Sequence, residues 1–386
     1  MHSANLSLVS HYFDHGATSF PKPSRVALAV KEYIDTIGGT YGRSAYLQAH
    51  QASSIVFDAR EKLAALLGAS DSSRVVFTQN ATWAINMAIQ GMCAPGKVVL
   101  VSPLEHNSVM RPLNMMADRI GIKIKVMPHS LTDGLINPSE ISCDDNVCLA
   151  VVNHVSNVNG VVQPVAEIKQ RIGEVPILVD AAQSAGEIPL NVSGDALDMV
   201  ALAGHKNLLG PTGTGALYVK DGLSISPLVP GGTGSRSEST TQPLTMPDAL
   251  EGGTPNIAGI AGLNAALNFI EEVGLKDQSK LVAKVISNLE TMNNLSIYKA
   301  DDPGRQGNLF SFSVAGASSS DIAYELFSKH KIAVRAGLHC SPAAHKTLGT
   351  LDVGGTVRIC LGHFHTEKDT DNLIAAIADV TGNKVF

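Results

Sequence analysis

The segment MVALAGHKNLLGPTGTG (residues 199–215) joins a short apolar run to a lysine and a glycine-rich turn. The apolar residues Met199–Ala203 predict a buried strand that ends just before Lys206. Four earlier stretches show the same order of a short apolar run, a polar turn and a helical pattern: Arg74–Phe77, Val98–Val101, Cys148–Val152 and Ile177–Val179. Such strands, apolar on both faces and separated by helices, are typical of a mostly parallel sheet covered on both sides. In this α/β class, ligands gather at the carboxyl ends of the strands.

The chain changes in character from about Lys276 onward. Short apolar runs there flank helical patterns, which predicts a compact antiparallel α+β unit. The predicted strands and helices are Leu309–Val314, Ile332–Val334, Val357–Leu361, Ser320–Lys329 and Thr366–Val380. We expect a large domain over residues 15–275 and a small C-terminal domain over residues 276–386 that includes residues 1–14. Residues 230–256 are rich in Gly, Ser, Thr and Pro, which predicts a long loop.

Composition excludes several classes of protein. Of the 386 residues, 44% are hydrophobic and 17% are charged, as in ordinary globular enzymes. The net charge of −6 and the lack of a Lys/Arg-rich run argue against nucleic acid or an acidic membrane surface as a partner. No apolar run is long enough to span a bilayer, and the first ten residues lack the pattern of a signal peptide. We therefore expect a cytoplasmic protein.

The five cysteines are odd in number and show neither CxxC spacing nor a His-rich neighbourhood. This pattern suits free thiols in a reducing compartment better than a disulfide framework or a metal site. Cys340 lies between Gly337 and Pro342, which predicts an exposed loop. The other four lie in or beside apolar runs and are interpreted as structural: Cys93, Cys143, Cys148 and Cys360.

Lys206 and Asp180 are the strongest chemical signal. A lysine at the end of a buried strand is costly unless it is used, and a lysine that holds an aldehyde cofactor must be neutral. Asp180 ends the preceding strand at a spacing that fits one strand–helix–strand step, and there it can keep the ring nitrogen of pyridoxal phosphate (PLP) protonated. Gln183, one turn later, can hydrogen-bond the ring hydroxyl. Alone, Lys206 reads as an exposed turn residue and Asp180 as a helix cap; together they predict a PLP site.

Three further strand ends add to this site. Residues 80–82 begin a helix whose N–H groups and threonine hydroxyl suit a phosphate, although Asn80 or Thr82 also fits a plain helix cap. His106 follows residues 98–101 and can lie over a planar cofactor. Asn157 follows residues 148–152 and can reach the ring oxygen. A lone His or Asn is usually just a polar loop residue. Here, however, successive strand ends supply a histidine, an amide, a carboxylate and a lysine, which together suit a PLP site.

These residues resemble the class V aminotransferase family of fold-type I PLP enzymes, and within it the cysteine desulfurase and selenocysteine lyase-like group. The matching stretches run from Tyr12 to Gly362: YFDHGATSFPKP, TQNATWAIN, EHNS, HVSNVNG, VDAAQ, AGHKNLLGPTGTGALYV, GGTPN, RAGLHCSP and TVRICLG. The resemblance implies a large mostly parallel sheet domain and a smaller α+β domain that carries the catalytic cysteine loop.

The resemblance also implies roles for individual residues. Lys206 would bind the cofactor aldehyde, Arg358 and Asn157 the substrate, and Cys340 would be the nucleophile. His106 would stack on the ring and take part in catalysis. The remaining cofactor contacts would come from Ala81, Thr82, Asn157, Asp180, Gln183, His205 and, from the partner subunit of a homodimer, Thr254.

The implied reaction removes sulfur from L-cysteine, giving L-alanine and a persulfide on Cys340 that a sulfur-acceptor protein would take. Arg335 or His339 would favour the Cys340 thiolate. The alternatives are a selenocysteine lyase, another β-lyase or an aminotransferase, but Cys340 weighs against a transaminase, which needs no thiol. A non-catalytic scaffold is disfavoured by the intact Lys206.

Four places depart from the family pattern: Ala203, Cys360, Ser341-Pro342 and Phe364-His365-Thr366. Ala203 stands where many relatives have Ser or Thr, so phosphate binding would depend more on Thr82 and His205. Phe364-His365-Thr366 replaces an aromatic-Asn-Thr motif.

Overall fold

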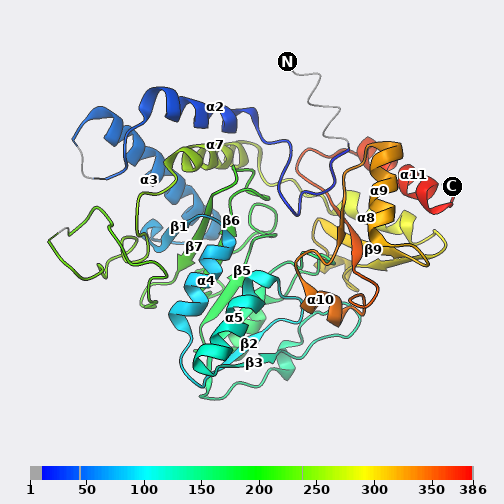
Figure 1. Cartoon of the computed structure of the whole chain (residues 1–386), viewed down its shortest axis with the longest axis horizontal. Coiled ribbons are helices and arrows are strands. Elements are labelled where there is room, and N and C mark those ends of the chain that lie inside the picture. The colour runs from blue at the N-terminus through cyan, green and yellow to red at the C-terminus, as the bar shows by residue number, and fades with distance from the viewer. Residues whose placement is uncertain (1–10, 43–44, 237, 385–386) are drawn as a thin grey trace.

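The computed structural model describes residues 11–42, 45–236 and 238–384. Its large domain is built on a seven-stranded sheet with the order β1-β7-β6-β5-β4-β2-β3 (Figure 1). Only β7 runs antiparallel to its neighbours in this sheet. The strands are β1 (Val75–Thr78), β2 (Val98–Val101), β3 (Lys123–Val126), β4 (Val147–Asn153), β5 (Ile177–Asp180), β6 (Met199–Ala203) and β7 (Gly215–Val219). The predicted mostly parallel sheet is confirmed.

Helices cover both faces of this sheet. They are α2 (Ser24–Glu32), α3 (Leu47–Leu67), α4 (Ala81–Met92), α5 (Asn107–Ile120), α6 (Val165–Ile172) and α7 (Ile257–Val273). Ile177 and Val179 of β5 pack in the core cluster that includes residues of α3, α6 and α7. Leu178, between them, packs with residues of α4 and α5 on the other face. Because both faces are buried, the strand needs an unbroken apolar run, and this run made it recognisable in the sequence.

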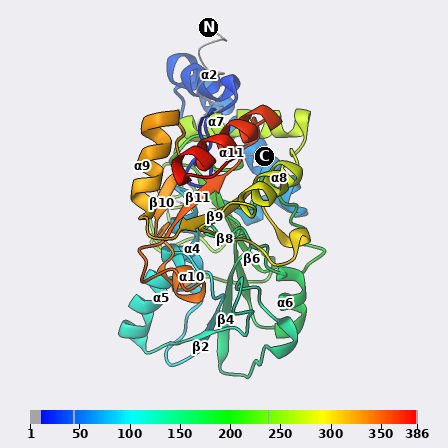
Figure 2. The same ribbon diagram turned by 90° about the vertical axis from the view of Figure 1, so that its right-hand side faces the viewer.

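The small domain contains a four-stranded antiparallel sheet with the order β10-β11-β9-β8. Helices α8, α9 and α11 lie together against it (Figure 2). The elements are α8 (Ser279–Leu289), β8 (Leu295–Tyr298), β9 (Leu309–Val314), α9 (Ser319–His330), β10 (Arg335–Gly337), α10 (Pro342–Thr347), β11 (Thr356–Cys360) and α11 (Glu367–Thr381). Alternate strand residues such as Phe310 and Ile359 fill the core between sheet and helices.

The segment that precedes α2 joins the small domain. The Phe13 N–H donates to Ala333 O at 2.8 Å, and the Cys360 N–H donates to Phe13 O at 2.9 Å. The Phe13 side chain is fully buried in the small-domain core. These contacts agree with the expected assignment of residues up to 14 to the small domain, although the boundaries at residues 15 and 275 stay a prediction. Residues 1–10, including those in which a signal peptide was sought, lie outside the described residues.

The sequence prediction of a strand over Ile332–Val334 is wrong by three residues, because β10 begins at Arg335. Ile332 is apolar because it fills the core after α9, and Ala333 makes only an isolated bridge to Tyr12. Strand β3 was not predicted, because Lys123 and Lys125 break the apolar pattern of this edge strand.

The described residues of 230–256 form neither helix nor strand, as the loop prediction requires. In the described ranges, no helix is both long and apolar enough for a membrane span. The same residues contain no group of three or more His, Cys, Asp or Glu side chains suited to a metal ion.

Glu251 anchors the end of the 230–256 loop to the large domain, and its removal should be costly. Both its oxygens accept hydrogen bonds from the buried Arg60, at 2.7 and 3.0 Å, and one also accepts the Phe77 N–H at 2.6 Å. Glu251→Ala should lower the free energy of unfolding by about 3–5 kcal/mol, because a buried cation loses its partner. Urea denaturation followed by circular dichroism measures the change.

Glu272→Ala is the matched control, since Glu272 pairs with Arg25 at 2.7 Å on the exposed surface. Its effect should be small, because water already solvates both charges. Equal losses in the two variants would contradict the role given to Glu251.

Candidate active site

One pocket lies at the carboxyl ends of the parallel strands, against the small domain. It is lined by most of the residues that the sequence analysis singled out: Ala81, Thr82, His106, Asn157, Asp180, Gln183, His205, Lys206, Cys340 and Arg358. Ala203 also lines it. The prediction that these separate strand ends meet is therefore confirmed as a matter of position, while the role of each residue stays a prediction.

Thr254 is the exception. It is exposed and lines a different hollow, together with Trp83 and Gly213. Within one subunit, it therefore contributes nothing to the pocket that holds Lys206.

The first turn of α4 forms one end of the pocket. Asn80 caps the helix, since its Oδ1 accepts the Trp83 N–H at 3.1 Å. Thr82 is thus not the cap, and within the described part of the chain its hydroxyl makes no hydrogen bond. His205 lies in the same pocket with Nδ1 buried and without a partner, and burial lowers its pKa to about 4. Helix N–H groups, a free hydroxyl and a neutral imidazole form a suitable anion site.

The turn that carries Lys206 is held in place by its backbone. The His205 carbonyl accepts the Ser19 N–H at 3.0 Å and the Lys22 amine at 3.2 Å. Burial lowers the pKa of Lys206 to about 8, although the nearby Asp180 opposes the shift. Among the described residues none hydrogen-bonds the Lys206 amine. The lowered pKa increases the neutral, reactive fraction of the amine, which becomes the main form above about pH 8.

Asp180 shares its surroundings with a second carboxyl group, Glu105, which the sequence analysis did not single out. Burial raises the pKa of both groups, and the charge of Asp180 adds to the effect on Glu105, whose pKa reaches about 8. Glu105 Oε1 accepts the Asn153 N–H at 2.9 Å, whereas Oε2 is buried without a partner. A protonated Glu105 leaves Asp180 as the single negative charge of the pair. The only sequence signal was its place beside His106 in EHNS.

His106 caps a helix as well as lining the pocket. Its Nδ1 accepts the Ser108 N–H at 3.0 Å and so caps α5. Burial, followed by the charge of Lys206, lowers the pKa of His106 to about 4. The ring is therefore neutral with its proton on Nε2, and its flat face is suited to stacking on a planar ligand.

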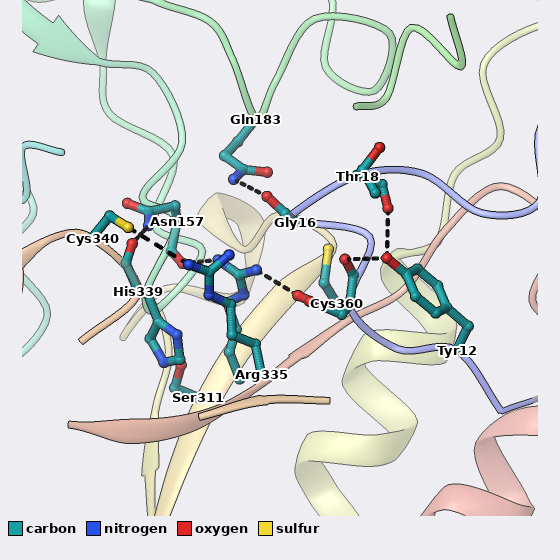
Figure 3. A network of polar contacts seen from close by, with 12 residues as sticks. Tyr12, Gly16, Thr18, Asn157, Gln183, Ser311, Arg335, His339, Cys340 and Cys360 are labelled. Carbon is teal, nitrogen blue, oxygen red and sulfur yellow. Dashed lines mark hydrogen bonds and ion pairs between the residues drawn. The ribbon is translucent and has the colours of Figure 1, made fainter. Parts of the chain in front are cut away.

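Only one of the two polar atoms of the Gln183 amide has a hydrogen-bond partner. Its Nε2 donates to Gly16 O at 2.9 Å, and Oε1 is buried with no partner (Figure 3). A buried acceptor without a donor is rare in proteins. Its position on the pocket wall indicates that a hydroxyl or N–H of a bound molecule completes it.

Asn157 holds the loop that carries Cys340. Its Nδ2 donates to His339 O at 2.8 Å (Figure 3). Its Oδ1 accepts the Ser341 hydroxyl at 2.7 Å. Both ends of the amide are thus engaged on either side of the cysteine. The role in ring or substrate binding that the resemblance implies stays a prediction, and the sequence analysis missed this loop contact because it joins residues far apart in the chain.

Cys340 is exposed on a constrained loop. His339 and Cys340 have positive φ angles of 49° and 59°, which non-glycine residues seldom adopt. The Asn107 N–H fixes the Cys340 carbonyl at 2.8 Å. Arg335 Nη2 lies 3.6 Å from Cys340 Sγ, and Figure 3 shows it pointing toward the sulfur.

Of the two neighbours expected to favour the thiolate, only Arg335 reaches it. His339 instead bonds the Thr356 hydroxyl through Nε2 at 3.0 Å. Burial, then the charge of Arg358, lowers the pKa of His339 to about 2, so this ring carries no charge.

Arg358 on β11 is almost fully buried at the junction of the domains. Its guanidinium binds Asp14 at 2.8 Å and the Asn157 carbonyl at 3.0 Å, and its Nε is buried without a partner. It packs so closely on Gly16 that a Cβ there would lie 2.8 Å from Arg358 Cζ.

The remaining cysteines differ in surroundings. Cys360 is buried, and its thiol donates to Asn308 at 3.7 Å, as its structural interpretation requires. Cys143 is exposed, so the expectation of a structural packing role for it is wrong; it lies in an irregular segment rather than in the apolar run that follows. Cys93 and Cys148 are half-buried.

Comparison with known proteins agrees with this geometry. Residues 11–373 match the family model described as aminotransferase class-V. A protein named probable cysteine desulfurase from Methanothermobacter thermautotrophicus is 32% identical over 97% of this chain and 96% of its own length. Cysteine desulfurase CsdA of Escherichia coli is also 32% identical, over 95% and 92%.

Solved structures are similar as well. The cysteine desulfurase of Thermococcus onnurineus superposes with a TM-score of 0.89 and 28% identity over 96% of this chain and 94% of that one. Together with the family model and the curated relatives, this shows that the chain belongs to the class V aminotransferase family.

Proposed function

We propose that this chain is a PLP-dependent cysteine desulfurase that converts L-cysteine to L-alanine and leaves the sulfur as a persulfide on Cys340. The observation that carries the proposal is the placement of an exposed cysteine, with Arg335 3.6 Å from its sulfur, in the same pocket as Lys206 and Asp180. The relatives that bear the name cysteine desulfurase support it.

The pocket residues fit PLP. The reactive amine of Lys206 suits the aldehyde, and the unpartnered Gln183 Oε1 suits the ring hydroxyl. Asp180 suits the pyridine nitrogen, because a neighbouring cation stabilises a carboxylate that burial disfavours. Thr82 and His205 suit the phosphate, and they make up for Ala203, which carries no hydroxyl. When bound, PLP would supply an electron sink for the negative charge that develops at the substrate Cα.

The chain's own residues would do the rest. Lys206, neutral above about pH 8, would accept the Cα proton of the substrate. Arg358 would orient the substrate carboxylate through its buried Nε–H, which has no partner, and through the N–H groups that Asp14 and Asn157 leave free. His106 would cover the ring as a neutral side chain and thus add no positive charge beside Lys206.

Cys340 would accept the sulfur. Its thiolate attacks the substrate sulfur, so that a sulfur–sulfur bond forms while the carbon–sulfur bond breaks and its electron pair returns to carbon. Protonation of that carbon skeleton then yields alanine. Arg335 would stabilise the thiolate before the attack. Because Cys340 is exposed, a thiol of an acceptor protein can reach the persulfide.

Assembly and location belong to the same proposal. We propose a homodimer in which Thr254 reaches the phosphate end of the neighbouring pocket, since it is exposed and lies outside its own pocket. We also propose a cytoplasmic location, because an odd set of unpaired cysteines persists best in a reducing compartment.

Cys340→Ser tests the function. The variant should bind PLP and keep its yellow colour, because no cofactor residue has changed. Release of sulfur from L-cysteine should fall by at least about 100-fold, since an alcohol is a poor substitute for a thiolate. Alanine and sulfide are measured with a dithiol reductant present, and mass spectrometry after a cysteine pulse locates the extra sulfur.

Lys206→Ala is the matched comparison and should lose the colour itself. Full desulfurase activity in Cys340→Ser, or a persulfide on Cys360, would overturn the assignment of the nucleophile. Selenide release from selenocysteine should survive in Cys340→Ser, because selenide is a better leaving group and can depart without a protein nucleophile.

Asn157→Ala should slow the transfer of sulfur to Cys340 more than the removal of the substrate Cα proton. Losing both hydrogen bonds to the Cys340 loop should lower the desulfuration rate about tenfold or more, as buried hydrogen bonds of this kind are worth about 1–3 kcal/mol. Exchange of the substrate Cα proton with D₂O does not need Cys340 and should change less. Proton NMR follows both rates in one sample.

Ser341→Ala removes only the loop side of the contact with Asn157 and serves as the control. It should slow desulfuration and leave the exchange rate unchanged. A parallel loss of exchange in Asn157→Ala, with a normal Ser341→Ala enzyme, would mean that Asn157 acts on the cofactor or substrate alone.

Thr254→Ala tests the dimer. Sedimentation should find twice the chain mass for both the unchanged protein and the variant, because one hydroxyl adds little to an interface. The variant should release PLP more readily on dilution, since a phosphate contact is lost. A monomer that retains PLP and full turnover would refute the shared site.

A further inference from the structure

Residues 14–22 form a strap that crosses from the small domain to the large one beside the pocket. Gly16 and Ala17 of this strap line the pocket itself. Throughout its described length, the strap has turns and bends but, apart from a bridge at Asp14, no regular secondary structure, and α2 begins after it at Ser24. Its shape must therefore come from contacts with the rest of the protein.

The first end of the strap is fixed on the small domain. Asp14 Oδ1 accepts a hydrogen bond from Arg358 Nη2 at 2.8 Å, and the Asp14 backbone forms a bridge with Cys360. The buried His15 packs so closely on Gly362 that a Cβ there would lie 2.1 Å from the imidazole ring. The guanidinium that would bind the substrate carboxylate and the first end of the strap thus belong to one packed unit.

The other end of the strap binds one carbonyl group, that of the peptide bond between His205 and Lys206. Four donors of the strap lie within hydrogen-bond distance of His205 O: Thr18 Oγ1 at 3.0 Å, the Ser19 N–H at 3.0 Å, Ser19 Oγ at 3.1 Å and the Lys22 amine at 3.2 Å. A carbonyl oxygen has two lone pairs, so these donors share them. The Lys22 amine also donates to Ser19 Oγ at 2.8 Å. This concentration of donors fixes the backbone directly before Lys206.

Hydrogen bonds also hold the middle of the strap. The Tyr12 hydroxyl lies 3.0 Å from Thr18 O and 3.3 Å from Asp14 O, so it closes the intervening residues into a loop (Figure 3). Gly16 O, between them, accepts Gln183 Nε2 at 2.9 Å. Because its carbonyl groups are bound along its length, the strap is a braced link between its two ends.

The proposed reaction depends on the relative placement of these two ends. Arg358 belongs to the small domain and Lys206 to the large one, yet the Lys206 amine must reach the Cα of a substrate whose carboxylate Arg358 holds. A misplacement of about 1 Å between reacting groups can lower a rate by about 100-fold. A link that contacts the guanidinium at one end and the Lys206 backbone at the other can set this distance.

We propose that the strap couples Arg358 to the turn of Lys206, with Asp14 and Lys22 as the positioning residues at its two ends. Asp14 directs the guanidinium toward the substrate carboxylate, and Lys22 holds the backbone from which the Lys206 amine reaches Cα. Neither Asp14 nor Lys22 lines the pocket, so each acts through another residue. This inference rests on the roles proposed for Lys206 and Arg358 and does not depend on that of Cys340.

The first test uses the holoenzyme and L-alanine, which carries no sulfur and so leaves Cys340 without a part. The cofactor absorbance reports alanine binding, and proton NMR reports exchange of the Cα proton with D₂O. Asp14→Asn should weaken alanine binding about tenfold and change exchange at saturation less than about threefold, because a charge-assisted bond to the guanidinium is lost. Lys22→Met should slow exchange about tenfold and change binding less than about threefold. Lys22→Arg, which keeps a charged donor, should recover most of the exchange rate.

The second test needs no substrate and follows the Lys206 turn by deuterium uptake of the full-length protein. The Leu209 N–H donates to Lys206 O and the Gly210 N–H to Gly204 O, both at 2.8 Å, so these amides report opening of the turn. Mass spectrometry of the peptide that covers them should find uptake about tenfold faster in Lys22→Met. Uptake should also rise in Asp14→Asn, because a strap released at one end holds the other end less firmly.

Lys31→Met and Asp35→Asn are the matched controls, since they make the same changes in an exposed ion pair beyond the strap, and neither should alter either measurement. The coupling is refuted if Asp14→Asn changes uptake in the Lys206 turn no more than Asp35→Asn does, or if Lys22→Met exchanges the alanine proton at the normal rate. Normal alanine exchange without sulfur release from cysteine in the unchanged protein would count against the desulfurase function alone. If the unchanged protein bound no PLP, deuterium uptake would still decide the role of the strap.

Discussion

The pocket depends on one buried cation, Arg358. Its β-strand belongs to the small domain, but its guanidinium binds the Asn157 carbonyl of the large domain and Asp14 of the N-terminal segment. A buried cation that loses a partner costs about 3–5 kcal/mol, so these parts of the chain must stay together. Gly16 follows from the same constraint, because any side chain there would displace the guanidinium. The pocket therefore exists only where the two domains and this segment meet.

The charges around the pocket follow from burial. His106, His205 and His339 are neutral because burial lowers the pKa of each of them, and the raised pKa of Glu105 leaves that group largely protonated. The charges that remain are the guanidinium groups of Arg335 and Arg358, the Lys206 amine, and the carboxylates of Asp180 and of Asp14, which is paired with Arg358. An excess of positive charge suits ligands that carry phosphate and carboxylate groups. The histidines contribute hydrogen bonds and flat faces without adding to that charge.

The strands that could be predicted from the sequence are those buried on both faces of the sheet. The β5 and β6 runs and the residues after them, such as Asp180 and Lys206, could be predicted because a buried parallel strand is apolar throughout and its end faces the site. Strand β3 could not, since one edge is open to water and tolerates lysine. Contacts made by side-chain direction were also out of reach. Arg335 and His339 both lie near Cys340 in sequence, yet one reaches the sulfur and the other bonds Thr356.

The cysteines show why exposure alone does not rank reactivity. Cys360 lies beside a guanidinium, but complete burial prevails and raises the pKa of its thiol. Cys143 is exposed, yet no hydrogen bond to its sulfur occurs within the described residues, and its pKa is also raised. A reactive thiol needs both access and donors aimed at sulfur. Cys340 meets both requirements, because it lies on an open loop and Arg335 points a guanidinium N–H toward its sulfur. The exposed loop could be recognised from the sequence, but the choice of Arg335 over His339 as the donor could not, because it depends on the direction of the two side chains.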